Sequence, residues 1–250
     1  MVETVQNLLH TTAIVNPLQK IQISERAFLP TATVVAVTKN ADPALLSQIW
    51  LMNNGIVAEA DFLPEALFSR GTVVVPTRRF LLNATRKRIQ LQLADFQDEQ
   101  AAQESISLMG KIVRLLPGLE LAALGLNFTA LLFPPDGAEF TEWNRKFAVP
   151  SLKELPGIMD ASPLFGTYVS FKVPPFRLTI ELKPSKVKNI SPKLPDLPIH
   201  SGQDMMTAIF NYHRELPSNT ALEAINESLE QWKAVFHRTK DIISFFSTIC

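Results

Sequence analysis

The stretch that decides the fold is "LELAALGLNFTALLF", residues 119–133. Successive side chains of a strand point to opposite faces, so Leu124, Leu126, Phe128, Ala130 and Leu132 fall on one face. The residues between them are also nearly uncharged. The pattern therefore predicts a central strand that is covered on both faces.

Other segments on either side also read as strands, some because they are rich in β-branched residues and others because they alternate apolar and polar residues with a period of two. They are residues 31–39, 73–75, 88–93, 167–173, 176–183 and 204–216. Helical spacing of apolar residues over 95–116 and from 220 to about 246 predicts two longer helices. Short helices are expected near 42–54 and 140–147. Together these elements predict an α+β fold, in which helices pack on antiparallel sheet and a long C-terminal helix ends the chain.

The order of elements is similar in the two parts of the chain. Residues 31–118 and 119–250 each read as strand, short helix, hairpin and longer helix, a β-α-β-β-α order with one extra strand in the second half. Two explanations remain open: the halves are diverged copies, or both use a common order of elements. In either case we expect a single compact domain over residues 1–250, since 46% of the 250 residues are hydrophobic.

Composition limits the classes of protein that fit. The 24 basic and 24 acidic residues balance, so any charged partner must be recognised by a local patch. The single cysteine, Cys250, rules out a disulfide framework and suits the cytoplasm. No run of about 18 apolar residues is present, so no membrane-spanning helix is expected.

Motifs of catalysis and cofactor binding are missing. The nine glycines form no dinucleotide or phosphate-binding loop and no nucleophile elbow. The four histidines lack a second ligand at metal-binding spacing, so we expect no metal and no cofactor. We therefore expect a binding protein rather than an enzyme. The alternative is an unrecognised hydrolase or small-molecule binder in a cleft between the halves, with His213, Tyr212 and Glu215 as candidates.

Two basic clusters are candidate binding sites. The first lies in "TRRFLLNATRKRIQLQL", residues 77–93, and contains Arg78, Arg79, Arg86, Lys87 and Arg88. The second contains Lys186, Lys188 and Lys193, in a Pro- and Lys-rich segment over 184–203 that we expect to be an exposed loop. Such charges often form only the solvated rim of a sheet. If the halves are related by pseudo-symmetry, the two clusters would instead make one positive surface for nucleic acid.

The C-terminal helix carries the strongest apolar pattern. Its stripe includes Trp232, Phe236, Ile243 and Phe246 at alternating three- and four-residue spacing. A stripe this wide is typical of a helix that lies across a sheet, and its C-terminal end has enough apolar width to contact a second copy as well. The leading hypothesis is thus a protein that binds other proteins and forms a homodimer, with nucleic-acid association as the alternative.

The layout also resembles a known family. The segments "RRFLLNATRKRIQLQL", "LPGLELAALGLNFTALLF" and "MTAIFNYHREL", followed by a long final helix, resemble a sporadically distributed family of uncharacterised bacterial proteins of about 250 residues. The resemblance is one of topology over about two thirds of the chain. It implies the same fold but no activity, substrate or site residue.

Overall fold

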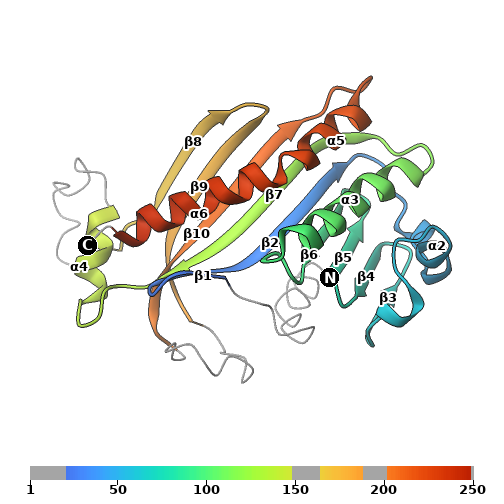
Figure 1. Cartoon of the computed structure of the whole chain (residues 1–250). Coiled ribbons are helices and arrows are strands. Elements are labelled where there is room, and N and C mark those ends of the chain that lie inside the picture. The colour runs from blue at the N-terminus through green and yellow to red at the C-terminus, as the bar shows by residue number, and fades with distance from the viewer. Residues whose placement is uncertain (1–20, 148–163, 188–201, 249–250) are drawn as a thin grey trace.

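The computed structural model describes residues 21–147, 164–187 and 202–248. In Figure 1, a single antiparallel sheet runs through the molecule, with β2 and β7 at its middle. Nine of the ten strands follow the order β3-β4-β5-β6-β2-β7-β10-β9-β8, and the tenth, β1, pairs with β2 off this path. The strands are β1 (Ile21–Ser24), β2 (Ala27–Thr38), β3 (Leu67–Phe68), β4 (Thr72–Pro76), β5 (Phe80–Thr85), β6 (Arg88–Leu93), β7 (Leu121–Leu132), β8 (Thr167–Val173), β9 (Phe176–Lys186) and β10 (Asp204–Glu215).

The longer helices all lie across the same face of this sheet (Figure 1). The α-helices are α2 (Gln48–Asn53), α3 (Glu99–Leu115), α4 (Phe140–Asn144), α5 (Ala221–Glu230) and α6 (Trp232–Thr248). The short 3₁₀ helices are η2 (Pro43–Leu45), η3 (Glu59–Asp61) and η4 (Arg145–Phe147). The predicted α+β class, with an antiparallel sheet, packed helices and a C-terminal helix, is confirmed.

The predicted final helix differs in one respect, because it is divided into two. Gln231 caps α5, and α6 begins at the next residue. Thr220 stands at the N-cap of α5, but its side chain makes no capping hydrogen bond. Thr220 and Glu223, which have the spacing of a capping box, therefore do not form one, and α5 depends on packing through its buried side chains.

An aromatic cluster attaches the helices to the sheet. The ring of Trp232 lies 5.0 Å from that of Phe128 on β7 and 6.1 Å from that of Phe236, measured between centroids. All three side chains are buried. Burying each large apolar side chain contributes about 1.5–3 kcal/mol relative to leaving it in water, so this cluster is a main reason why α6 lies against the sheet.

The second face of the sheet differs from the prediction. β7 is central, as expected, but no helix of the described residues covers its other face. On that side Asn127, Thr129 and Leu131 are only partly buried. An antiparallel sheet can pack helices on one face and leave the other in contact with solvent, whereas a parallel sheet is usually covered on both faces. We call this side the open face.

The two halves match more closely than the sequence suggested. The first runs β2, α2, β4-β5-β6, α3, and the second runs β7, α4, β8-β9-β10, α5-α6. In space their strands are arranged symmetrically about the β2–β7 boundary. The expected two-stranded hairpin of the first half is three strands, because Thr77 accepts backbone hydrogen bonds from Arg79 and Phe80 and makes a turn between β4 and β5.

The predicted loop over residues 184–203 begins later than expected. Strand β9 continues to Lys186, where Pro184 pairs with Met206 and Lys186 with Asp204. Residues 188–201 lie outside the described part of the chain. The alternation over residues 176–183 predicted β9. Its last three residues were not predicted, because a proline such as Pro184 is usually read as the end of a strand.

Candidate functional site

Polar side chains form a row across the open face. Strand register makes the following residues successive neighbours from β8 to β6: Ser170, Thr179, Asn211, Asn127, Thr33 and Gln92. Neighbouring strands are about 4.8 Å apart, so the row is about 24 Å long. Each of these side chains carries an amide or a hydroxyl, so the row is a line of hydrogen-bonding groups.

A second row lies beside the first and includes positive charge. It passes from Lys172 on β8 through Arg177 and His213 to Gly125, Val35 and Gln90. Arg177 donates a hydrogen bond from Nε to Oγ of Ser170, at 2.8 Å. This hydrogen bond to the neighbouring strand holds the Arg177 side chain against the face. It uses only Nε, so the terminal N–H groups of the guanidinium take no part in it.

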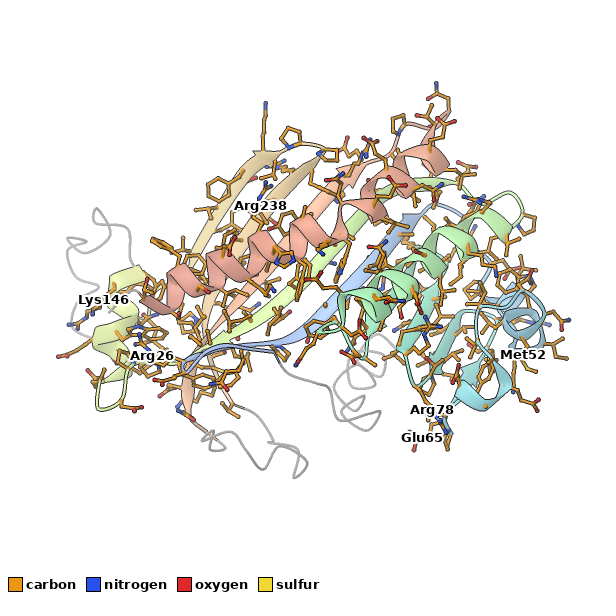
Figure 2. The ribbon with its side chains drawn as sticks, viewed as in Figure 1. Arg26, Met52, Glu65, Arg78, Lys146 and Arg238 are labelled. Atoms are coloured by element: carbon orange, nitrogen blue, oxygen red, sulfur yellow. The ribbon has the colours of Figure 1, made fainter. Side chains whose placement is uncertain are left out.

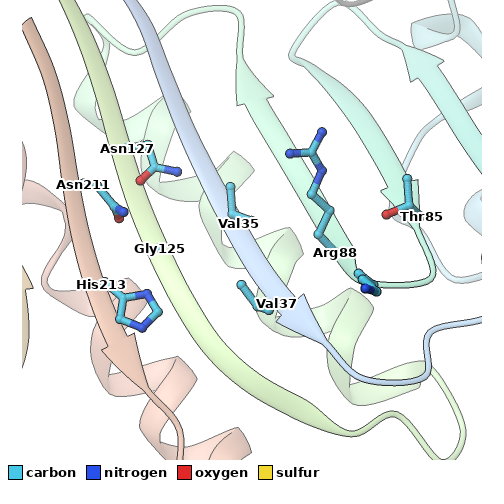
Figure 3. Close-up of a pocket in the computed structure, with 9 residues that line it drawn as sticks. Val35, Val37, Thr85, Arg88, Gly125, Asn127, Asn211 and His213 are labelled. Carbon is cyan, nitrogen blue, oxygen red and sulfur yellow. The ribbon is translucent and has the colours of Figure 1, made fainter. Parts of the chain in front are cut away.

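A hollow of about 430 Å³ opens in the middle of the open face. Figure 3 shows its side chains in front of the strands and the helices behind them. The lining residues are Val35, Val37, Thr85, Lys87, Arg88, Gly125, Asn127, Asn211 and His213. They contain two permanent cations, a histidine and two amides but no carboxylate, so the hollow is suited to an anionic, hydrogen-bonding ligand.

Gly125 is the residue that makes room for the hollow. A Cβ at this position would lie 3.5 Å from Oδ1 of Asn127 and 3.7 Å from Oδ1 of Asn211, which are ordinary contact distances. A glycine in a central strand weakens the strand and often marks a close approach by another group. Here its lack of a side chain leaves the space between the two asparagines unfilled.

The side-chain carbonyl oxygen of Asn127 lacks a hydrogen-bond donor among the described residues. Its Oδ1 atom is inaccessible to solvent and has no partner among the described residues. An acceptor left unpaired in this way costs about 1–3 kcal/mol. A donor from a ligand, combined with a rotation of the amide, would remove that penalty.

The first basic cluster is divided between the two ends of its hairpin. Arg86 and Lys87 form the two-residue turn between β5 and β6, and Arg88 starts β6 beside them. Arg78 and Arg79 lie at the opposite end, about 20 Å away along a six-residue strand. Arg79 pairs with Glu104 of α3, at 3.4 Å, and Figure 2 shows Arg78 at the edge of the molecule. Only the tip therefore belongs to the open face.

The second basic cluster contributes little to the open face. The register places Lys186 on the helix side of the sheet, where it pairs with Asp204 at 3.6 Å. Lys188 and Lys193 lie outside the described residues. The structure thus does not join Lys186 to the hairpin tip in one positive surface. The cations opposite the tip are Arg177 and Lys172, which the sequence did not single out.

The candidate interface residues on the C-terminal helix lie in the core. Trp232, Phe236 and Ile243 are 1%, 1% and 0% exposed, and Phe246 is half-buried against Phe147 and Phe210. Their assignment to a dimer interface is therefore wrong for the first three, because the sheet of the same chain already covers them. The packing of this stripe on the sheet, which its width predicted, is what the structure shows.

The three residues proposed for a cleft are also separated. His213 lines the hollow, whereas Tyr212 points to the helix side and is fully buried. Burial raises the pKa of Tyr212 above its usual value of 10.0, an effect that the hydroxyl of Thr239, 3.1 Å away, partly offsets. Glu215 is exposed at the end of β10 and does not line the hollow. The hollow does lie where the halves meet, but it brings together no acid–base pair.

The residues that sequence reasoning missed are Gly125, Asn127 and Asn211. The available signal was the period of two itself, because Gly125 and Asn127 interrupt the apolar pattern on the same side of β7. Among the described residues, no group of three histidine, cysteine or carboxylate side chains is placed to hold a metal ion. None of the helices in the described ranges has the length and apolarity needed to cross a membrane.

The chain has no clear relative among known proteins in the three comparisons made. No family model matches the chain, and no curated protein matches it. Among solved structures, a rolling circle replication initiator protein from Geobacillus stearothermophilus has a TM-score of 0.30 and 9% identity, over 81% of this chain and 79% of that chain. A likeness this weak carries no argument about fold or function, so the proposals below depend on the structure alone.

Proposed function

We propose that this chain binds duplex nucleic acid on the open face of its sheet. The observation that carries the proposal is the hollow, which is lined by Lys87, Arg88, His213 and two amides without a carboxylate. Nucleic-acid recognition divides into phosphate contacts, made by cations, and contacts to base edges, made mainly by side chains with paired donors and acceptors. The open face contains both kinds of group.

The arrangement of these groups supports an extended ligand. Arg88 on β6 and Arg177 on β9 are four strand spacings apart, about 19 Å, and the amides of Asn127 and Asn211 lie between them. Cations on both sides would contact phosphates, and the amides would reach base edges in a groove. A compact metabolite would occupy the hollow but would leave most of the polar row without partners.

The scarcity of aromatic side chains favours a duplex over a single strand. Sheets that bind single strands stack unpaired bases on aromatic rings. Among the described residues of the open face, Tyr168 at the β8 edge is the aromatic side chain that is exposed, and Phe28 is buried in a small cluster with Phe133 and Met205. The bases of a duplex are already stacked, so this face loses nothing by lacking a stacking platform.

A protein partner fits the open face less well. Protein interfaces depend on a buried centre with apolar or aromatic anchors. The centre of this face combines Val35 and Val37 with Gly125, two asparagines and His213, and it offers no aromatic anchor. Protein binding and self-association, if they occur, thus require a surface other than the open face.

The test fills the hollow without changing any charge. Gly125→Val adds a β-branched side chain suited to a strand, and its Cβ would meet the two asparagines at ordinary contact distances of 3.5–3.7 Å. Binding of a fluorescently labelled duplex, and of its single strand, is measured by anisotropy. We expect the wild type to bind the duplex more tightly than the single strand, and Gly125→Val to weaken duplex binding by about tenfold, the equivalent of one lost amide contact.

The matched control is Thr129→Val, which changes the same strand and the same face outside the hollow. It is expected to bind like the wild type. Thermal melting confirms that both variants are folded. The proposal is contradicted if the wild type fails to bind duplex at low salt, if Gly125→Val binds normally, or if the single strand is preferred.

A further inference from the structure

The outer edge of β8 is unpaired in the described part of the chain. β8 is the last strand of the sheet and pairs on one side only, with β9 (Figure 1). Alternate residues of an antiparallel edge strand direct their N–H and C=O groups away from the neighbouring strand. The edge of β8 is therefore a template for one more strand.

The strand lacks the usual features that prevent pairing. Its sequence, "TYVSFKV", is rich in β-branched and aromatic residues, has one charge and contains no proline. Its ladder with β9 is regular over all seven pairs, without a bulge. Proteins that keep an edge free of partners place several charges, a proline or a bulge there. Tyr168 and Phe171 are instead 66% and 49% exposed.

The strand is complementary to itself. When two copies run antiparallel about Ser170, Tyr168 of one stands opposite Lys172 of the other, and Val169 stands opposite Phe171. Thr167 then faces Val173. Aromatic and β-branched residues make favourable cross-strand pairs, and a lysine beside an aromatic ring is also favourable. Lys172, the only charged residue of β8, thus faces Tyr168 of the other copy and not the other Lys172.

We propose that two copies of this chain associate through antiparallel pairing of β8, centred on Ser170. The two sheets become one continuous sheet, and a two-fold axis perpendicular to it leaves both open faces on the same side. The proposal rests on the backbone edge of β8 and not on the hollow, although one of its cross-strand pairs uses Lys172, which also lies in the second row of the open face. It also gives the predicted self-association a surface other than the buried stripe of α6.

The experiment uses charge repulsion and its rescue. Tyr168→Lys places a lysine opposite Lys172 at both ends of the pairing, where like charges destabilise. Within one chain the introduced lysine faces Glu181, its neighbour on β9, so folding is preserved. Sedimentation velocity over a range of protein concentrations measures the dimer dissociation constant. We expect a concentration-dependent dimer for the wild type and a dissociation constant raised by about tenfold or more in the variant.

The second variant, Tyr168→Lys with Lys172→Glu, places opposite charges at the same two positions. It is expected to restore dimerisation to about the wild-type level. The matched control is Phe245→Lys on α6, because Phe245 is 63% exposed and Tyr168 is 66% exposed; this control is expected to dimerise normally. A wild type that stays monomeric at every concentration overturns the proposal. So does a Tyr168→Lys variant that dimerises normally, a double variant that stays weak, or a Phe245→Lys variant that fails to dimerise.

Discussion

The salt dependence of duplex binding provides the sharpest test of the open face. Four cations flank the amides on this face: Lys87 and Arg88 on one side, Lys172 and Arg177 on the other. Each phosphate contact releases bound counterions, so the logarithm of the binding constant falls by about 0.9 per contact for each tenfold rise in salt. Four contacts predict a slope of about −3.6, and a rise from about 50 to about 200 mM salt then weakens binding about 150-fold.

Replacing Lys87 and Arg88 with glutamine removes one side of this arrangement. Lys87 is exposed and Arg88 is partly exposed, so the double variant is expected to fold normally. Two contacts remain, the predicted slope is about −1.8, and the same rise in salt weakens binding only about 12-fold. The assay is duplex anisotropy at five or more salt concentrations, with the slope as the measured quantity.

The matched control removes two cations from the helix side of the molecule. Arg114 on α3 and Arg238 on α6 are exposed, and Figure 2 labels Arg238 above the sheet. Their replacement with glutamine changes the net charge equally but is expected to leave the slope at about −3.6. If both double variants lower the slope to the same degree, or if neither does, the phosphate contacts are not on the open face.

Two further predictions concern the core. Phe236→Ala removes a side chain that is 1% exposed and packs on the rings of Phe96, Phe128 and Trp232, so the free energy of unfolding in urea is expected to fall by about 3–5 kcal/mol; a loss below about 1 kcal/mol would show that α6 is not packed as described. The raised pKa of Tyr212 predicts that stability is full below the normal tyrosine pKa and declines as the pH rises through the folded-state value. In urea unfolding above about pH 10, Tyr212→Phe is expected to reduce the decline in the free energy of unfolding. Near neutral pH the same variant is expected to lose about 1 kcal/mol of stability, because Thr239 loses its hydrogen-bonding partner. An unchanged alkaline decline in the variant would assign it to other groups.

Much of the architecture follows from the sequence alone. The period of two in β6, β9 and β10 identified strands with one buried face, and helical spacing over residues 95–116 identified α3. These features are local, because the backbone geometry of a strand or helix fixes which nearby residues share a face.

The candidate site was decided by tertiary structure. Gly125 and His213 are far apart in the chain, and only the pairing of β7 with β10 makes them neighbours. Periodicity divides each strand into two faces, but it does not say which strands are adjacent, in what register, or which face the helices cover. For the same reason the stripe of Trp232 and Phe236 was compatible with a dimer seam until packing on β7 placed it in the core. Local periodicity thus determined the elements, and long-range strand pairing determined which of their side chains meet.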